Sequence, residues 1–376
     1  MKITKVEAII LRLPIITADV DGTQDDLIIR IETDEGVTGY GEVDSSPDSI
    51  KAIVDARSSH GICYGLRELL LGQDPLHIEQ LWRTMYQKTS YYGRFGPVLH
   101  AMSGVDLALW DIAGKVRGAP LYQMFGACYR KRVMAYASSL MPETPEAARA
   151  LAREFRAAGF QAMKFGWGPI GQNLEFDYEL FQAVREGAGP GTRIMIDAGQ
   201  AYTWKQAARV CEWLSDLDTT WLEEPLDPDD LEGYAHLAGA SRVAIAAGEA
   251  ESGFRAFERI VLQGRIDIVQ PDLSRCGGFT EARKIAHLAE MHRRRCLPHA
   301  FKSNILLAAS LQFCAATPNA DMLEFSMSNS PIRRKMTLEE FRVIDGHVEV
   351  PERPGLGVTL NPDLLRELAP GEVAAS

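Results

Sequence analysis

Short strand-like segments alternate with amphipathic helix-like segments along residues 133–326, and no other feature constrains the fold as strongly. The helical stretches include Pro145–Ala158, Lys205–Asp216 and Phe279–Arg293, whose apolar residues recur at the helical period. Such alternation predicts a parallel sheet and best fits a closed (β/α)8 barrel of the TIM type. An open doubly wound sheet is the alternative, but no Gly-x-Gly-x-x-Gly motif follows the early strands. The predicted strands are Val133–Ser138, Gln161–Phe165, Arg193–Asp197, Thr220–Glu223, Val243–Glu249, Asp267–Gln270, Cys296–His299 and Asp321–Phe325.

The residues before the barrel follow a different pattern. Ile3–Leu13 and Leu27–Thr33 alternate or run apolar like β-strands, and Asp34–Val37 form a turn into the second strand of a hairpin. Residues 51–125 change to the helical period, most clearly at Ala101–Val116. We therefore predict three parts, which are an α+β unit at residues 1–128, the barrel at residues 129–330, and a C-terminal segment at residues 331–376 that returns to the first unit.

Composition excludes several classes of protein. The 46% hydrophobic and 24% charged content is that of a globular chain, and the formal net charge of −11 argues against nucleic acid as a partner. No apolar run approaches the roughly 18 residues that a membrane span needs, and the first residues are strand-like rather than a cleavable signal. The six cysteines include no Cys-x-x-Cys pair, which argues against disulfides or a zinc knuckle. We expect a cytoplasmic enzyme with neither a nucleic-acid nor a membrane partner.

Acidic residues end three consecutive predicted strands. Asp197 lies in IMIDAG, Glu223 in WLEEP and Glu249 in AAGEA. A barrel gathers the C-terminal ends of its strands at one mouth, where barrel enzymes keep their active sites. Carboxylates gathered there repel one another unless a cation neutralises them, and oxygen ligands suit Mg²⁺; the alternative is that each acid only caps the next helix. We predict Glu223 as the ligand, because strand alternation turns Glu224 to the other face.

A second group of polar residues follows the later strands. Asp272 in QPD and His299 in PHA end adjacent predicted strands. A carboxylate beside a histidine fixes its tautomer and raises its pKa, as a general base requires, although a lone histidine in an apolar strand is more often a core residue. Glu324 ends the eighth predicted strand and is a candidate to hydrogen-bond a substrate oxygen opposite the metal; the alternative is a helix cap or a salt bridge.

Lys164, in QAMKFGWGP, ends the second predicted strand. A lysine that faces the barrel mouth opposite a histidine can hold a substrate carboxylate or transfer a proton, and the alternative is an exposed cation at a strand end. Gly166 and Gly168 leave a flexible loop after it, in which Trp167 is predicted to line the mouth and bind substrate.

Together these residues resemble the enolase superfamily, and within it the mandelate racemase/muconate lactonizing enzyme family. The resemblance covers nearly the whole chain, with the motifs IDAG, EEP, GE, QPD…GG and PH in family order and LHAMSGVDLALWDIAGKVRGAPLYQMFG as the helical segment of the N-terminal capping domain. It implies a modified (β/α)8 barrel with an α+β capping domain, and Mg²⁺ held by Asp197, Glu223 and Glu249 against a substrate carboxylate. It also implies that a base removes the proton α to that carboxylate, and that the resulting enediolate is reprotonated or expels a β-hydroxyl.

The second-strand motif departs from the family pattern. The family's Lys-x-Lys would place a second basic residue where this chain has Gly166. A racemase needs a base on each face of the carbon, whereas one base, His299, is sufficient for a dehydratase. This favours dehydration of an acid sugar to a 2-keto-3-deoxy acid, with a racemase, epimerase or lactone cycloisomerase as the alternative if Lys164 serves the opposite face. Asp272 argues against the muconate cycloisomerase and dipeptide epimerase groups, which have a lysine at the sixth strand.

The substrate is expected to be a sugar acid, and its identity to depend on the capping domain. Ile15–Gln24 and Ser90–Gly96 correspond to the family's specificity loops. In the second loop, Tyr92 offers a hydroxyl and Arg94 a bidentate carboxylate binder, which indicates a second acid group on the substrate unless Arg94 is only a surface residue. The segment VDSSPDS at residues 43–49 indicates an ordinary connection.

Two further expectations concern the assembly of the protein and its class. Members of the family commonly assemble, so a homo-oligomer is expected. A non-catalytic sugar-acid binding protein is a third hypothesis, but binding alone does not require a paired Asp272 and His299.

Overall fold

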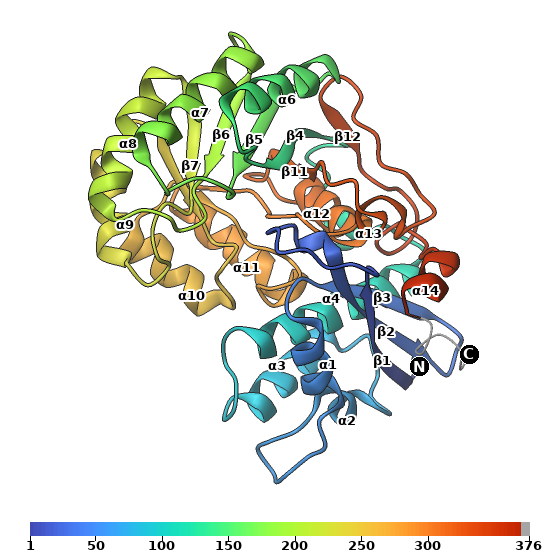
Figure 1. Cartoon of the computed structure of the whole chain (residues 1–376). Coiled ribbons are helices and arrows are strands. Elements are labelled where there is room, and N and C mark those ends of the chain that lie inside the picture. Colours follow the sequence, from blue (N-terminus) through green and yellow to red (C-terminus); the bar gives the residue numbers. More distant parts are fainter. Residues whose placement is uncertain (370–376) are drawn as a thin grey trace.

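The structure, a computed structural model that describes residues 1–369, begins with an antiparallel sheet of three strands (Figure 1). β1 (Ile3–Arg12) pairs with β2 (Asp25–Thr33), and β2 pairs with β3 (Thr38–Val43), so the predicted hairpin is confirmed. A 3-10 turn, η1 (Gly22–Gln24), lies between the first two strands. The helices that follow are α1 (Pro47–Asp55), α2 (Leu66–Leu70), α3 (Ile78–Thr89), α4 (Pro97–Arg117) and α5 (Leu121–Met124).

Helix α4 joins this sheet to the rest of the molecule. A Cβ atom on Gly41 of β3 would lie only 1.9 Å from the backbone oxygen of Gly104 in α4, so glycine lets the strand and the helix touch directly. Toward the barrel, the buried Asp106 of α4 accepts a hydrogen bond from the backbone N–H of Thr280, at 3.0 Å, in the first turn of α11 (Gly278–Met291). The capping domain is therefore packed against the barrel through α4.

The predicted (β/α)8 barrel is confirmed. Its parallel strands are neighbours in chain order from the first to the seventh, and the eighth returns to pair with the first, so the sheet curls on itself. Between β10 and β11 the backbone N–H of Cys296 donates to the oxygen of Asn319 at 2.9 Å. The strands are β4 (Arg132–Leu140), β5 (Ala162–Gly166), β6 (Arg193–Asp197), β7 (Thr219–Glu223), β8 (Ala244–Ala247), β9 (Ile268–Val269), β10 (Arg295–Cys296) and β11 (Met322–Ser326).

Helices cover the outer face of this sheet, as Figure 1 shows for α6 to α9. Each connects one strand to the next, which is the arrangement that parallel strands require. They are α6 (Pro145–Ala157), α7 (Leu174–Ala188), α8 (Trp204–Asp216), α9 (Leu231–Ala240), α10 (Phe254–Arg259) with a π-helical turn, η2 (Ile260–Gly264), then α11, and α12 (Asn304–Ala316).

A layer of apolar side chains fills the barrel interior, with one residue from each strand or its immediate extension. These residues are Tyr136, Ala162, Met195, Trp221, Ala246, Ile268, Leu297 and Met322. Side chains two positions apart on a strand point to the same face, so the next inward layer consists of the residues two positions further along. That layer contains Ser138, Lys164, Asp197, Glu223, Gly248, Gln270, His299 and Glu324. The alternation of the strands therefore places a polar layer directly above an apolar plug.

The fifth to seventh barrel strands are shorter than predicted. Gly248, with a φ of 136°, ends the regular strand before Glu249. Pro271 and Pro298 have no N–H to donate and interrupt the ladder after β9 and β10. The segments that follow β9 and β10 pair again in an isolated parallel bridge between Asp272 and His299, so these two residues still lie side by side.

The segment after β11 contacts both domains. β12 (His347–Glu349) pairs antiparallel with β4, while the backbone N–H of Leu356 donates to Asp111 of α4 at 2.9 Å. The remaining helices are α13 (Pro331–Lys335) and α14 (Pro362–Leu368). Within residues 1–369, no helix combines the length and the apolar character needed to cross a membrane.

Candidate active site

A cavity of about 340 Å³ lies between the polar layer of the barrel and the capping domain. Val20, Gly22 and Asp44 reach it from the capping domain. Val20 and Gly22 belong to the predicted specificity loop at residues 15–24. The barrel residues that line the cavity include Ser138, Lys164, Gly166, Trp167, Asp197, Gln200, Glu249, Arg275, His299 and Glu324.

The three predicted metal ligands come together at this cavity, and two of them, Asp197 and Glu249, line its wall. Asp197, Glu223 and Glu249 are buried, and one carboxylate oxygen from each lies within 4.8 Å of the others. Trp221 Nε1 and Gln270 Nε2 donate to the same oxygen of Glu223, Oε2, at 2.9 and 2.8 Å, which fixes its orientation. The three carboxylates therefore present a compact set of hard oxygen ligands.

The charge of this cluster is suited to a divalent cation. Burial and the neighbouring Glu223 hold the pKa of Asp197 well above its usual range, against the opposing effect of Lys164. Both effects disfavour the ionised carboxylate, and a cation bound beside it would oppose them. Mg²⁺ prefers carboxylate oxygens, so the residues present fit this ion. Glu224 lies outside the set and accepts hydrogen bonds from Gln200 Nε2 and the N–H of Ala250.

Lys164 lies among the carboxylates rather than at an exposed strand end. Its ammonium is hydrogen-bonded to Glu223 and lies 3.0 Å from Glu324 Oε1 and 3.7 Å from Asp197 Oδ2. Burial lowers the pKa of Lys164, but the pull of Glu223 and Glu324 is stronger and raises it well above the usual value. In this arrangement Lys164 carries a positive charge shared by three acids.

The glycine that replaces the family's second lysine is packed too tightly to carry a side chain. A Cβ atom on Gly166 would lie 2.4 Å from the Cβ of Asp197 and 2.8 Å from its backbone oxygen. A longer residue would therefore displace Asp197 or the strand. Position 166 therefore offers no base, and the packing around it leaves no room for one without such a shift.

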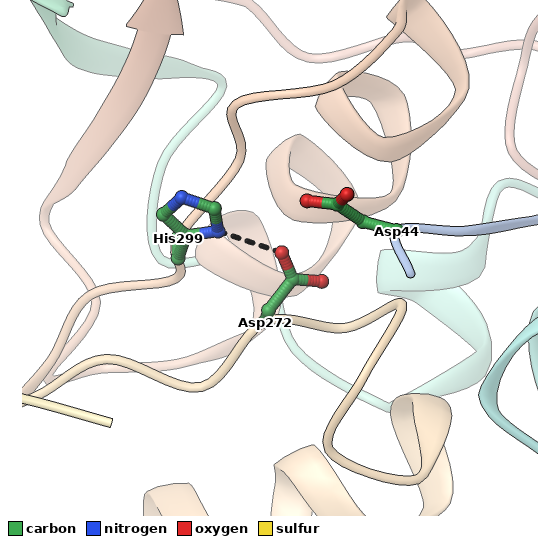
Figure 2. Close-up of side chains that lie close together, drawn as sticks. All are labelled: Asp44, Asp272 and His299. Carbon is green, nitrogen blue, oxygen red and sulfur yellow. Dashed lines mark hydrogen bonds and ion pairs between the residues drawn. The ribbon is translucent and has the colours of Figure 1, made fainter. Parts of the chain in front are cut away.

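His299 and Asp272 form a hydrogen-bonded pair beside the carboxylate cluster (Figure 2). His299 Nδ1 lies 2.7 Å from Asp272 Oδ2, while Asp272 Oδ1 accepts from the N–H and the hydroxyl of Ser274, both at 2.6 Å. The other ring nitrogen, Nε2, lies 3.2 Å from Glu249 Oε2 and 3.8 Å from Glu324 Oε2. Nδ1 is thus occupied by Asp272, and Nε2 faces the cavity side.

The electrostatic environment of His299 favours its protonated form. Burial lowers the pKa of His299, but Glu249, Glu324 and Asp272 together outweigh this effect and raise it to about 10. Since Glu249 belongs to the set that fits Mg²⁺, a bound cation would weaken its attraction for the imidazolium. The pKa of His299 would then move back toward neutrality, which is where a general base is effective.

Glu324 lies between Lys164 and His299. It accepts hydrogen bonds from the Ser138 hydroxyl at 2.7 Å and from the N–H of Ala300 at 2.8 Å. Burial raises the pKa of Glu324, whereas Lys164 and His299 lower it more, to about 2. It is therefore a fixed anion that holds the two basic side chains on either side of it.

The residues predicted to bind substrate are divided between two places. Trp167, with a φ of 58°, lines the cavity. Tyr92 donates its hydroxyl to the backbone oxygen of Tyr64 at 2.7 Å, and Arg94 lies over the ring of Phe95. Neither Tyr92 nor Arg94 is among the described residues that line the cavity, and Arg94 instead borders a separate pocket at α3 and α10.

Sequence reasoning missed several polar residues of the site, among them Asp44, Arg275, Gln270 and Ser138. The interpretation of residues 43–49 as an ordinary connection is wrong, because Asp44 follows β3 directly into the cavity, where Arg275 meets it. Gln270 and Ser138 were also missed. Both lie two positions after an apolar residue of the barrel interior, so counting by two along each predicted strand would have found them.

Comparisons with known proteins agree with this architecture. The family model described as Enolase C-terminal domain-like matches residues 147–364, and the Mandelate racemase / muconate lactonizing enzyme N-terminal domain matches residues 3–126. The D-galactarolactone cycloisomerase of Agrobacterium fabrum is 35% identical over 354 residues, covering 91% of this chain and 90% of that protein. The D-xylonate dehydratase of Haloferax volcanii is 34% identical over 367 residues, covering 92% and 86%.

A solved structure supports the same assignment. A racemase from Streptomyces coelicolor with bound magnesium aligns with a TM-score of 0.86 at 33% identity, covering 98% of this chain and 99% of that one. The chain therefore belongs to the mandelate racemase/muconate lactonizing enzyme family of the enolase superfamily, as its motifs predicted.

Replacing Asp197, Glu223 or Glu249 one at a time by its amide should weaken Mg²⁺ binding by at least about 10²-fold, since even outer partners of metal sites contribute 10–100-fold. Isothermal titration of Mg²⁺ into each purified variant measures the effect. Glu212→Gln, an exposed change on α8, is the control. Equal Mg²⁺ affinity in the natural protein and all three variants would contradict the ligand assignment.

Proposed function

We propose that this protein is a Mg²⁺-dependent acid-sugar dehydratase that converts a 2,3-dihydroxy acid to a 2-keto-3-deoxy acid. The observation that carries the proposal is the geometry of His299, whose Nδ1 is held by Asp272 while Nε2 faces the cavity beside Glu249. The dehydratase among the relatives named above supports the reaction class. The proposal includes a cytoplasmic location and a homo-oligomeric state. Sedimentation of the purified protein would test the oligomeric state.

The metal and the protein have separate parts in this reaction. Mg²⁺, when bound by Asp197, Glu223 and Glu249, would hold the substrate carboxylate and stabilise the negative charge that develops on it. Lys164 and Glu324 lie at the edge of that cluster, where Lys164 adds a positive charge and Glu324 accepts a hydrogen bond from a substrate hydroxyl.

His299 carries out both proton transfers. Its Nε2 takes the proton from the carbon α to the carboxylate, and Asp272 stabilises the imidazolium through Nδ1. The electron pair of the broken C–H bond first delocalises into the carboxylate. It then forms the C2–C3 double bond as the C3–O bond breaks, and the departing hydroxide takes the proton from Nε2 to leave as water. The enol product then becomes the 2-keto-3-deoxy acid. One base on one side of the substrate completes the cycle.

A lactone cycloisomerase or an epimerase is the second candidate function. It is supported by the cycloisomerase among the relatives and by Lys164, which lies on the opposite side of Glu324 from His299. Either reaction would require a second proton donor at C2 or at the ring oxygen. The packing of Gly166 on Asp197 leaves Lys164 as the candidate for this role.

His299→Asn should lower turnover of the substrate by about 10³-fold, because asparagine keeps the volume of the ring edge but cannot accept the proton. The same variant should bind Mg²⁺ and unfold like the natural protein. Formation of the keto acid from a panel of aldonates, measured as its semicarbazone, gives the rate. His287→Asn, exposed on α11, is the matched control, and full activity in His299→Asn would overturn the base assignment.

Lys164→Ala separates the two candidate functions. In a dehydratase the lysine supplies only positive charge, so dehydration should fall by about 10²-fold yet stay measurable. In an epimerase or cycloisomerase it transfers a proton, so turnover of one epimer should vanish while exchange by His299 continues. Measuring turnover of both C2 epimers of one acid decides between these outcomes.

A further inference from the structure

Asp44 brings a carboxylate from the capping domain to the catalytic pair. It follows β3, lines the cavity, and points toward His299 and Asp272 in Figure 2. One ligand atom of each of these three residues lies within 4.8 Å of the others. Asp44 therefore lies where the part of a substrate beyond the reacting carbons would meet the capping domain.

Asp44 forms an ion pair with the guanidinium of Arg275, which would otherwise be available to bind an acid group of the substrate. Arg275 Nη2 lies 2.6 Å from Asp44 Oδ2, and Nε donates to the backbone oxygen of Asp44 at 3.0 Å. Nη1 donates to the backbone oxygen of Glu249 at 3.3 Å and lies 3.6 Å from its carboxylate. All three nitrogens of Arg275 are thus engaged, in a fork geometry that suits a carboxylate ligand.

The other cations near the cavity are engaged as well. Lys302 lies 3.2 Å from Asp44 Oδ1, donates to the backbone oxygen of Gly22, and is only 2% exposed. Lys164 is surrounded by Asp197, Glu223 and Glu324. Within the described residues, Lys164 and Arg275 are the basic side chains, apart from His299, that line the cavity. Each of these two cations already has an acidic partner within the protein. A second carboxylate on the substrate would therefore have to compete with that partner.

We propose that Asp44 is a specificity determinant that restricts this site to sugar acids with one carboxylate. The inference rests on the proposed function, in which the metal cluster takes that carboxylate. Burying a further carboxylate beside Asp44 would add like charge where, among the described residues, the lysine and the arginine that line the cavity already have acidic partners, and this is unfavourable. Hydroxyl groups instead can donate to Asp44 and exchange hydrogen bonds with Ser139 and Gln200 in the same wall.

The sequence indicated the opposite preference through Arg94. Arg94 does not line the cavity but borders a separate pocket, so it gives no reason to expect a second acid group on the substrate. Arg275 is the arginine at the cavity, and Asp44 neutralises it. Rejection of diacids therefore arises from one cross-domain ion pair rather than from the shape of a loop, and removal of its acid should reverse it.

The test compares matched pairs of acids that differ only in a terminal carboxylate. The pairs are D-gluconate with D-glucarate, D-galactonate with galactarate, and D-xylonate with xylarate. Dissociation constants are measured by isothermal titration with Mg²⁺ present and with His299→Asn as the common background, so that turnover does not interfere.

We expect the tightest-binding aldonate to bind at least tenfold more tightly than its aldarate. Asp44→Asn should reduce this ratio at least tenfold by freeing Arg275, whereas the exposed Asp48→Asn, in the same segment, should leave it unchanged.

The possible outcomes are distinct. An aldarate that binds as tightly as its aldonate would overturn the inference, as would an Asp44→Asn variant that loses affinity for both acids equally. Failure of all six acids to bind would overturn it too, because the cavity is claimed to accept acids of this kind. Dehydration of an aldarate by the natural protein would overturn this inference and leave the proposed function in place.

Discussion

Buried negative charge at one end of the barrel is the constraint on which the rest of the site depends. Two carboxylates about 4–5 Å apart repel by roughly 3–4 kcal/mol at an effective dielectric constant of about 20, and three such pairs meet at Asp197, Glu223 and Glu249. Lys164 supplies one positive charge to this group and shares it with Glu324. Arg275 and His299 also lie near Glu249, but each is shared with a further acid, Asp44 or Asp272. A divalent cation would therefore be favourable at this cluster, where the substrate carboxylate would bind.

The barrel creates this constraint by a simple repeat. An apolar residue on each strand fills the interior, and the residue two positions later forms the polar layer at the mouth. The same spacing that buries Trp221 therefore places Glu223, and the one that buries Leu297 places His299. The apolar plug excludes water from below, which strengthens each electrostatic contact above it. The core and the candidate active site are consecutive layers of one structure.

The sequence predicted most of this because the informative residues lie in regular strands. Period and motif were sufficient to place Asp197, Glu223 and His299 at the mouth of the barrel. Asp44 was missed because it lies after a strand of the other domain, and its contact with Arg275 joins residues that are 231 positions apart. Arg94 has the chemistry of a carboxylate binder, but the orientation of its loop relative to the barrel depends on packing between domains. Local patterns do not encode such long-range placement.

In the proposed reaction, one base acts on one face of the substrate carbon. Proton NMR in D₂O with Mg²⁺, across aldonates, uronates, aldarates and their lactones, tests it most directly. We expect a 2-keto-3-deoxy acid with deuterium at C3 to form, while unreacted substrate keeps its original configuration at C2. Accumulation of the C2 epimer carrying deuterium, or of a ring-opened lactone product without loss of water, would contradict the account and assign Lys164 the second proton transfer.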